Sequence, residues 1–238
     1  MGFNARFTSI AAGLLFSLVS QAGLSAEVGD RDPWEGFNRK IFVFNDTLDR
    51  YFLKPVAKGY RAVTPDPVET GVSNFFSNLL EVRNILNDVL QWKWLQASND
   101  TGRLIVNSTA GVVGIFDVAR HFGMPRSEGE DFGQTFAVWG AGEGAYLVLP
   151  FLGSSTVRDV FGYPLGAYVH PVSSIDHIRT RNVLMGADLL DTRAKLLDAE
   201  DLLSGDKYSF IRDAYLQRRT YLIQDGVVED DFGGELDF

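Results

Sequence analysis

The chain contains no cysteine among its 238 residues. It therefore forms no internal disulfide and offers no thiol for metal binding, redox chemistry or acylation. A lack of disulfides is ordinary in an exported protein large enough to have a hydrophobic core. The lack of cysteine matters for residues 24–26. Their sequence, Leu-Ser-Ala, is typical of the end of a bacterial lipoprotein signal. The next residue is Glu27 instead of the cysteine that would carry the lipid.

The N-terminus also lacks an apolar run long enough to cross a bilayer. Its uncharged run, FTSIAAGLLFSLVS at 7–20, is shorter than the roughly 20 apolar residues that a spanning helix needs. Arg6 precedes the run and small residues follow it, an order typical of an export signal. We predict a signal peptide over 1–26, cleaved after Ala26 or Ala22; the alternative is a buried N-terminal helix. One domain at 27–225 and an acidic, disordered tail at 226–238 complete the predicted organisation.

Positive charge is in deficit. The chain has 22 Lys and Arg residues against 31 Asp and Glu. Residues 1–26 hold Arg6 as their only charged side chain, so their removal leaves 21 against 31, a formal charge of −10. This balance excludes a nucleic-acid partner, whose affinity depends on clustered cations. Any membrane affinity must come from buried apolar area.

Residues suited to catalysis are scarce. Of the three histidines, His170 and His177 are separated by Pro171, and no carboxylate cluster joins them or His121 in a metal set. Gly153-Ser154-Ser155 lacks the G-x-S-x-G turn of hydrolases, and no G-x-x-x-x-G-K-[ST] phosphate loop is present. We therefore predict a protein that is not an enzyme and that uses no metal and no cofactor.

Apolar residues recur at three- and four-residue steps, which predicts a mostly helical fold. Asp32-Pro33 is expected to cap and begin the first helix, and Lys54-Pro55 to end it. Asp66-Pro67 begins a second helix that runs toward Trp94. The first helix carries an aromatic-rich stripe, made of Trp34, Phe37, Ile41, Phe44, Leu48 and Phe52.

The rest of the chain is more varied. Residues 104–119 are apolar on most sides, which predicts a helix that is deeply buried or faces lipid. A segment rich in glycine follows, and Ser154 and Ser155 are candidates to cap the helix after it. A further helix is expected to begin at Ser173 or Ser174 and to break at Ser204-Gly205. The last helix is expected to end near Asp225-Gly226.

Six blocks of sequence carry a resemblance. They are DPWEGFNRKIFVFND at 32–46, LKPVA at 53–57, GVSNFFSNL at 71–79, DFGQT at 131–135, GSSTVRD at 153–159 and RDAYLQRR at 212–219. In this order, over residues 32–225, they resemble the MlaA/VacJ family of outer-membrane lipoproteins that remove misplaced phospholipid. The chain departs from the family pattern at Glu81-Val82, where Glu-Pro is expected, at Ala145, where proline is expected, and at Glu27.

The resemblance implies an all-α fold: a ring of amphipathic helices lying in the membrane interface plane, with a central polar passage and a glycine-rich hairpin. It also implies phospholipid as cargo, an outer-membrane porin trimer as the holder of the ring, and a soluble periplasmic lipid carrier as the recipient. The physical chemistry is consistent, because apolar helix faces favour acyl chains and a lipid head needs polar groups along its path.

Polar residues within apolar or glycine-rich stretches are the candidates for that path: Asp117, Gln134, Thr135, Arg158 and Asp159. Their alternative role is ordinary helix capping and core hydrogen bonding. Gly140, Gly142 and Gly144 are candidates for a hinge that lets the hairpin gate the passage. The alternative is a loop that bends without gating.

The expected function is removal of phospholipid from the outer leaflet of the outer membrane through an amphipathic channel, which maintains lipid asymmetry. The alternatives are a porin-associated scaffold that passes no lipid and a lipid hydrolase that uses Ser154. We expect the protein at the periplasmic face of the outer membrane. Apolar helix faces and a porin, instead of an acyl chain at Glu27, are expected to hold it there.

Overall fold

The computed structural model describes residues 31–199 and 205–227. The predicted signal peptide and nearly all of the predicted acidic tail lie outside these residues. Within them the fold is mostly helical, as the sequence predicts, and it also contains one small antiparallel sheet. The elements are α2 (Glu35–Leu48), π-helix η1 (Asp49–Leu53), α3 (Lys54–Val63), α4 (Asp66–Leu90), α5 (Trp94–Thr109), 3₁₀-helix η2 (Ala119–Phe122), α6 (Phe132–Val138), β1 (Tyr146–Leu149), β2 (Gly153–Thr156), α7 (Val157–Val169), 3₁₀-helix η3 (Pro171–Ser174), α8 (Ile178–Lys195) and α9 (Lys207–Ile223).

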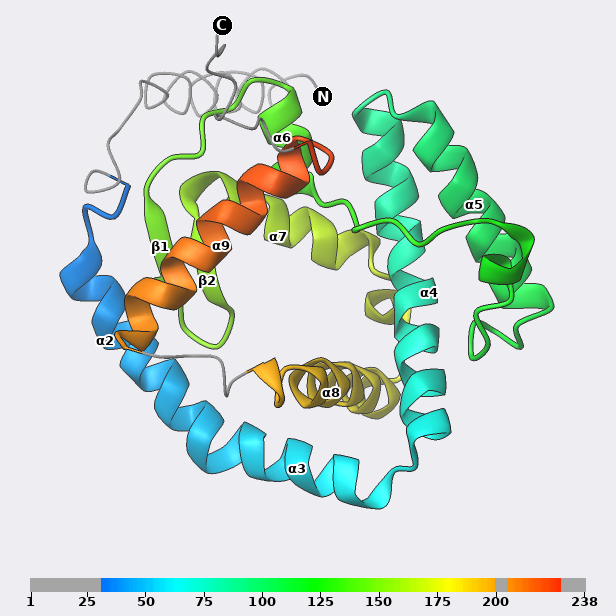
Figure 1. The fold of residues 1–238 in the computed structure, drawn as a ribbon, viewed down its shortest axis with the longest axis horizontal. Helices are drawn as coiled ribbons and strands as arrows, with labels where there is room; N and C mark the ends of the chain where they lie inside the picture. Colours follow the sequence, from blue (N-terminus) through cyan, green and yellow to red (C-terminus); the bar gives the residue numbers. More distant parts are fainter. Residues whose placement is uncertain (1–30, 200–204, 228–238) are drawn as a thin grey trace, which may run out of the picture.

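The helices form a ring (Figure 1). α2, η1 and α3 make a curved arm along one side, and α4 with α5 makes the opposite side. α9 and α7 lie along a third side, while α8 points inward and contacts both α3 and α4. The inner faces of α4, α7, α8 and α9 therefore look toward one central region.

The curved arm differs from its prediction at both ends. Lys54-Pro55 does not end the first helix, because the chain passes through the wide turn of η1 and continues as α3 with the proline in its first turn. A first-turn proline is tolerated since its missing N–H would have few helical partners there. Asp32 does not cap α2. It is buried, and its carboxylate accepts hydrogen bonds from Asn38 Nδ2 and Tyr208 Oη.

Two asparagines of α2 pin the hairpin of β1 and β2 to the arm. Asn38 accepts from Val148 N (2.9 Å) and donates to Tyr146 O (3.1 Å). Asn45, seven residues or two helical turns further on, bonds Leu149 O and Phe151 N in the same way, both at 2.9 Å. Each amide thus satisfies the outer edge of a two-stranded sheet that would be marginal alone. The predicted glycine-rich hairpin is present, and it is attached at both ends of its first strand.

The predicted helix over 104–119 is wrong beyond Thr109. The chain turns back there, and Val112 and Val113 adopt left-handed φ values of 54° and 59°. Gly111 permits the turn, because a Cβ at this position would lie 2.2 Å from the carbonyl oxygen of Phe116. The apolar side chains of this segment are consequently displayed on a loop instead of a helix face.

The helix predicted to begin at Ser173 or Ser174 begins later. Ser173 and Ser174 lie in η3, and α8 begins at Ile178 with His177 as its cap, its ring Nδ1 accepting from Thr180 N. α9 ends at Ile223, close to the predicted Asp225-Gly226, where both residues have positive φ.

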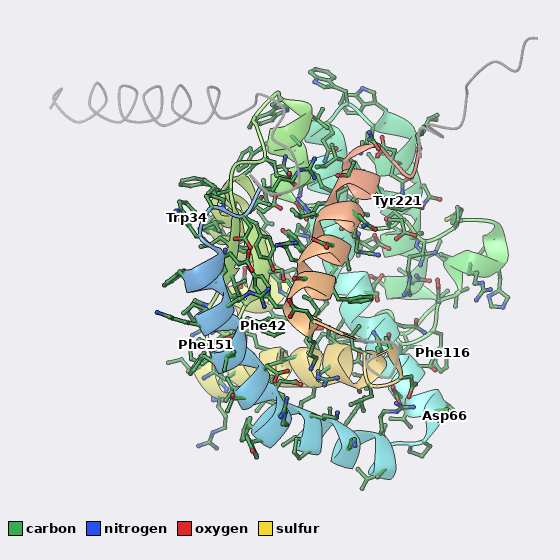
Figure 2. All side chains as sticks on the ribbon, turned by 60° about the vertical axis from the view of Figure 1, so that its left-hand side comes forward. Trp34, Phe42, Asp66, Phe116, Phe151 and Tyr221 are labelled. Atoms are coloured by element: carbon green, nitrogen blue, oxygen red, sulfur yellow. The ribbon has the colours of Figure 1, made fainter. Side chains whose placement is uncertain are left out.

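The polarity of the molecule is inverted relative to a water-soluble domain. Among the described residues, polar and charged side chains outnumber hydrophobic ones at fully buried positions. Large apolar side chains are exposed instead, with Trp34, Phe116 and Phe151 at the outer edge of the ribbon (Figure 2). Buried charged residues and a broad apolar exterior are both unusual for a domain surrounded by water. Within the described residues, each helix is too short or too polar to cross a membrane.

Candidate functional site

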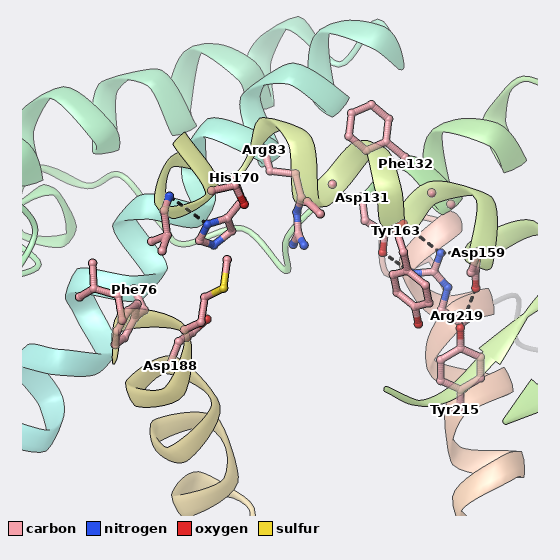
Figure 3. Close-up of a pocket in the computed structure, with 18 residues that line it drawn as sticks. Phe76, Arg83, Asp131, Phe132, Asp159, Tyr163, His170, Asp188, Tyr215 and Arg219 are labelled. Carbon is pink, nitrogen blue, oxygen red and sulfur yellow. Dashed lines mark hydrogen bonds and ion pairs between the residues drawn. The ribbon is translucent and has the colours of Figure 1, made fainter. Parts of the chain in front are cut away.

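A cavity of about 450 Å³ lies inside the ring. Its walls come from α4, the start of α6, α7, η3, α8 and α9, so segments far apart in the sequence meet there (Figure 3). Gly133 and Gly162 allow α6 to cross α7 closely, because a Cβ on Gly162 would lie 2.9 Å from the backbone nitrogen of Gly133. The cavity depends on this close crossing for one of its walls.

The lining of the cavity is amphipathic. Phe76, Val172, Leu184 and Met185 supply an apolar part from α4, η3 and α8. The polar part contains both charge signs: Arg83, Asp131, Asp159, His170, Asp188 and Arg219. A cavity with this lining is suited to a molecule that has a charged end and an apolar end.

Arg219 organises one wall of the cavity. Its guanidinium donates to Asp131 Oδ2 at 2.5 Å and to Asp159 Oδ1 at 2.9 Å, and Tyr215 Oη donates to Asp159 Oδ2 at 2.7 Å. Burial alone would raise the pKa of Asp131, but the hydrogen bonds and charge of Arg219 outweigh it and lower that pKa. Gly133 makes room, because a Cβ there would lie 2.3 Å from Asp159 Oδ1. This wall is a closed ion-pair network, in which Nε alone among the guanidinium nitrogens of Arg219 has no hydrogen-bond partner within the described residues.

Arg83 occupies a different part of the cavity and has no such partners. Its Nε atom is buried without a hydrogen-bond partner, and within the described residues its guanidinium makes no ion pair. Burial lowers the pKa of Arg83, as expected when a cation is removed from water. Its aliphatic stem passes over Gly166 of α7, 3.9 Å from where a Cβ would stand.

His170 and Asp188 lie near Arg83 (Figure 3). His170 Nδ1 accepts from the backbone N–H of Val172 at 3.2 Å, so the neutral ring carries its proton on Nε2. Burial lowers the pKa of His170 and raises the pKa of Asp188. Within the described residues the Asp188 carboxylate accepts no hydrogen bond.

Four of the five residues predicted for the lipid path lie together, and one of these lines the cavity. Asp159 is in the wall, and Arg158 is buried beside it with Nε 3.2 Å from Asp159 Oδ1. Gln134 is behind the wall and donates to Gly129 O, while Thr135 donates to Asn87 Oδ1. These three neighbours of the wall serve the capping and core hydrogen bonds that the sequence left as their alternative role.

Asp117 lies elsewhere, on the α4–α5 side of the ring. It pairs with Arg103 at 3.0 Å and accepts from Asn107 at 3.1 Å. Arg103 also pairs with Glu81 at 3.2 Å, so this buried pair joins α5 to α4. The half-buried Asp117 links the pair to Arg126 at 3.7 Å. Asp117 does not line the cavity.

The glycines predicted as hinges precede the hairpin and do not line the cavity. Gly140 and Gly144 have φ values of +89° and +71°, and Gly142 does not have a positive φ. A Cβ on Gly144 would lie 2.9 Å from Val157 Cβ. Two of the three glycines therefore have a backbone conformation that other residues rarely adopt.

The sequence did not single out Arg83, Asp188 or Arg219. Arg219 lies within the RDAYLQRR block, where Arg218 and Arg219 look alike, yet one is 63% exposed and the other 7%. Arg83 and Asp188 are isolated charges on amphipathic helices, and such charges usually mark the solvent face.

Two alternatives considered from the sequence concern Ser154 and a metal site. The hydroxyl of Ser154 is 2.8 Å from Tyr146 Oη, and this hydrogen bond lies within the hairpin. Among the described residues, His, Asp and Glu side chains form no group of three arranged to hold a metal ion.

Asp88 is a buried acid outside the cavity, and neither of its carboxylate oxygens has a hydrogen-bond partner among the residues that the structure describes. Burial first, and then the charges of Asp100 and Glu130, raise its pKa to about 8. An aspartate in the unfolded chain releases its proton near pH 3.9. Between these values the native state holds a proton that the unfolded state has lost, so the free energy of unfolding falls as pH rises from about 4 to about 8.

We therefore expect Asp88→Asn, which mimics the protonated acid, to stabilise the protein selectively at high pH. The gain in unfolding free energy should be near zero at pH 4 and about 2–4 kcal/mol at pH 8, below the limit of about 1.4 kcal/mol per pH unit. Denaturant unfolding at both pH values measures it, with the exposed Asp176→Asn as control. An equal effect at both pH values would contradict this assignment.

Comparisons with known proteins agree with one another. The sequence profile of the family described as MlaA lipoprotein matches residues 30–222. Proteins of Escherichia coli (strain K12) and Shigella flexneri, both named intermembrane phospholipid transport system lipoprotein MlaA, are each 34% identical over 232 residues, covering 93% of this chain and 90% of theirs. A protein of the same name from Haemophilus influenzae is 31% identical over 206 residues, covering 84% of this chain and 82% of its own.

A solved structure is also similar. It belongs to work on the structural basis for maintenance of bacterial outer membrane lipid asymmetry. It superposes with a TM-score of 0.71 at 36% sequence identity, and the match covers 81% of this chain and 98% of the other.

Proposed function

Because the chain belongs to the MlaA lipoprotein family, we propose that it removes phospholipid from the outer leaflet of the outer membrane and passes it toward the periplasm. The cavity inside the ring is the proposed route. The relatives from Escherichia coli and Haemophilus influenzae are named for intermembrane phospholipid transport, and that role is the one proposed for this chain.

The observation that carries the proposal is the inverted polarity of the ring. A phospholipid head crosses hydrocarbon only at a high free-energy cost, so a route for it needs polar groups shielded from the acyl chains. Here charged side chains line an interior cavity, while large apolar side chains of the arm, such as Phe37 and Phe52, face outward. Such an arrangement places polar groups on the inside and apolar groups against lipid.

Attachment to the membrane follows from the same exterior. The exposed aromatic and aliphatic side chains of α2, η1 and α3 supply apolar area, each Å² of which stabilises an embedded state by about 25 cal/mol. This attachment does not require a cysteine at position 27. We further propose that an outer-membrane porin trimer holds the ring and that a soluble periplasmic carrier receives the lipid.

The proposed transport involves no bond chemistry. The sequence contains no Walker-type phosphate loop, so the proposed flux runs downhill, from phospholipid dispersed among lipopolysaccharide to phospholipid held by a carrier. Gly140, Gly142 and Gly144 retain their proposed role as the hinge of the hairpin, and Asp159 is the predicted path residue that the cavity supports.

Deletion of the protein tests this function. We expect surface-exposed phospholipid to rise several-fold in cells of the source bacterium, and expression of the intact chain to restore the low value. Accessibility of outer-leaflet phospholipid to an impermeant amine-reactive label measures it, with fractionation to place the protein in the outer membrane. Unchanged surface phospholipid after deletion would refute the transport proposal, and a solely soluble periplasmic pool would refute membrane residence.

A further inference from the structure

Arg83 makes no ion pair within the described residues, although the cavity that it lines also contains Asp131, Asp159 and Asp188. It projects from α4 into the cavity, its Nε is buried without a partner, and within the described residues no carboxylate pairs with it. A guanidinium removed from water is unfavourable unless an anion compensates it. Within the described residues no ion pair compensates it, so Arg83 is available to bind the anionic group of a ligand.

The charge of the other arginine in the cavity lining, Arg219, is compensated by two carboxylates. Arg219 lies within 3.1 Å of Asp131 and Asp159, and its two terminal nitrogens donate to those carboxylates, although its Nε, like that of Arg83, has no partner within the described residues. It is consequently not available to a ligand. Of the two guanidinium groups in the lining, Arg83 is the one open to an incoming anion.

A second donor accompanies Arg83. The His170 ring and the Arg83 guanidinium point into the same space (Figure 3). Since His170 Nδ1 is occupied by the backbone of Val172, its protonated Nε2 is the atom that remains to donate. A guanidinium and an imidazole N–H on the same space form a typical donor pair for phosphate oxygens.

Asp188 supplies the opposite charge in the same part of the cavity. It lines the cavity from α8, its carboxylate accepts no hydrogen bond within the described residues, and the ionisable groups that act on it are His170, Asp191, Lys195 and Arg83. A carboxylate beside a phosphate site disfavours additional negative charge and favours an ammonium group. Phe76, Leu184 and Met185 border the same space with apolar surface.

We propose that Arg83, His170 and Asp188 form a binding site for a zwitterionic phospholipid headgroup. The phosphate diester binds Arg83 and His170 Nε2–H, the headgroup ammonium binds Asp188, and the glycerol and acyl chains lie toward Phe76, Leu184 and Met185. This inference rests on the proposed function, because it requires phospholipid to enter the cavity. It makes the cavity a selective site, with aminophospholipid favoured over anionic phospholipid and over lipids that lack phosphate.

Calorimetric titration of the purified full-length chain in detergent tests the proposal. The probes are dihexanoyl phosphatidylethanolamine, dihexanoyl phosphatidylglycerol, dihexanoylglycerol and glycerophosphoethanolamine. We expect phosphatidylethanolamine to bind about fivefold more tightly than phosphatidylglycerol, and dihexanoylglycerol to bind at least tenfold more weakly than either. Glycerophosphoethanolamine, which has the headgroup without acyl chains, should bind weakly. The variants Arg83→Met and Asp188→Asn should lose this binding.

Three variants separate the roles of the charges. Arg83→Met should weaken both phospholipids about tenfold and leave dihexanoylglycerol unchanged, and Arg83→Lys should weaken them less because it keeps the charge without the planar fork. Asp188→Asn should reduce phosphatidylethanolamine to the affinity of phosphatidylglycerol. Arg218→Met, at an exposed arginine outside the cavity, is the control and should change nothing.

The outcomes distinguish this inference from the function on which it rests. Binding of all three lipids with equal affinity, or unchanged discrimination in Arg83→Met, overturns the headgroup site while leaving lipid entry intact. Tighter binding of phosphatidylglycerol than of phosphatidylethanolamine overturns the role of Asp188. Failure of every lipid to bind overturns both proposals.

Discussion

Replacing Arg219 with alanine is expected to lower the free energy of unfolding by about 3–5 kcal/mol, the cost of leaving a buried ion pair without one partner. Arg219 is 7% exposed and holds two carboxylates, Asp131 and Asp159, on one cavity wall. Without the guanidinium, the hydrogen-bond donors left to those carboxylates within the described residues are Gln134 N, Tyr215 Oη and Arg158 Nε. Asp159, which is 5% exposed, would then keep only Arg158 as an ion-pair partner within the described residues, and the partly exposed Asp131 would lose its ion pair.

The adjacent arginine provides a matched control. Arg218 is 63% exposed and lies 3.7 Å from Glu128, itself 63% exposed, so Arg218→Ala should change stability by less than about 0.5 kcal/mol. Neutralising the acids as well, in Arg219→Met with Asp131→Asn and Asp159→Asn, should recover part of the loss because no buried charge remains unpaired. Urea unfolding followed by circular dichroism measures all three. Equal losses for the two arginines would contradict the closed ion-pair network.

The positions and ends of helices were predictable from the sequence where they depended on residues close together in the chain. The helical spacing located α4, and Asp225-Gly226 located the end of α9 within two residues. The prediction that Lys54-Pro55 ends the first helix was wrong because it assumed that the turn before the proline has the ordinary width of an α-helix. Here the wider turn of η1 precedes the proline, and the arm continues. No local signal in the sequence announces such a turn.

The prediction of one helix over residues 104–119 was wrong for a related reason. Its apolar content predicts contact with lipid or core, but the backbone path depends on the contact between Gly111 and the carbonyl of Phe116, five residues later. Hydrophobic periodicity indicates which side chains avoid water, but it does not indicate whether they lie on a helix or on a loop.

The candidate site was partly predictable. Polar residues in apolar stretches pointed to Asp159, which does line the cavity, but the same criterion selected Asp117, whose partners lie between α4 and α5. Arg83 could not be recognised from the sequence as a site residue, because what distinguishes it is that it makes no ion pair within the described residues. Such an absence exists only once α4, α7 and α8 are packed together.

Filling the cavity is expected to abolish transport without unfolding the protein. Gly166 of α7 lines the cavity, its φ is not positive, and the nearest atom to a Cβ at this position would be Arg83 Cδ at 3.9 Å. A tryptophan there can therefore grow into the cavity without meeting backbone, and replacing a helical glycine favours the helix. Gly186 of α8 has no atom within 4 Å of its Cβ position and does not line the cavity, so Gly186→Trp is the matched control.

Surface-exposed phospholipid in cells that carry only Gly166→Trp or only Gly186→Trp is the most direct test of the cavity as the lipid route. With equal amounts of folded protein in the outer membrane, we expect Gly166→Trp to resemble the deletion, with at least a tenfold loss of transport, and Gly186→Trp to resemble the unaltered chain. Full activity of Gly166→Trp would contradict the route through the ring and would favour a scaffold that docks on porins and passes no lipid.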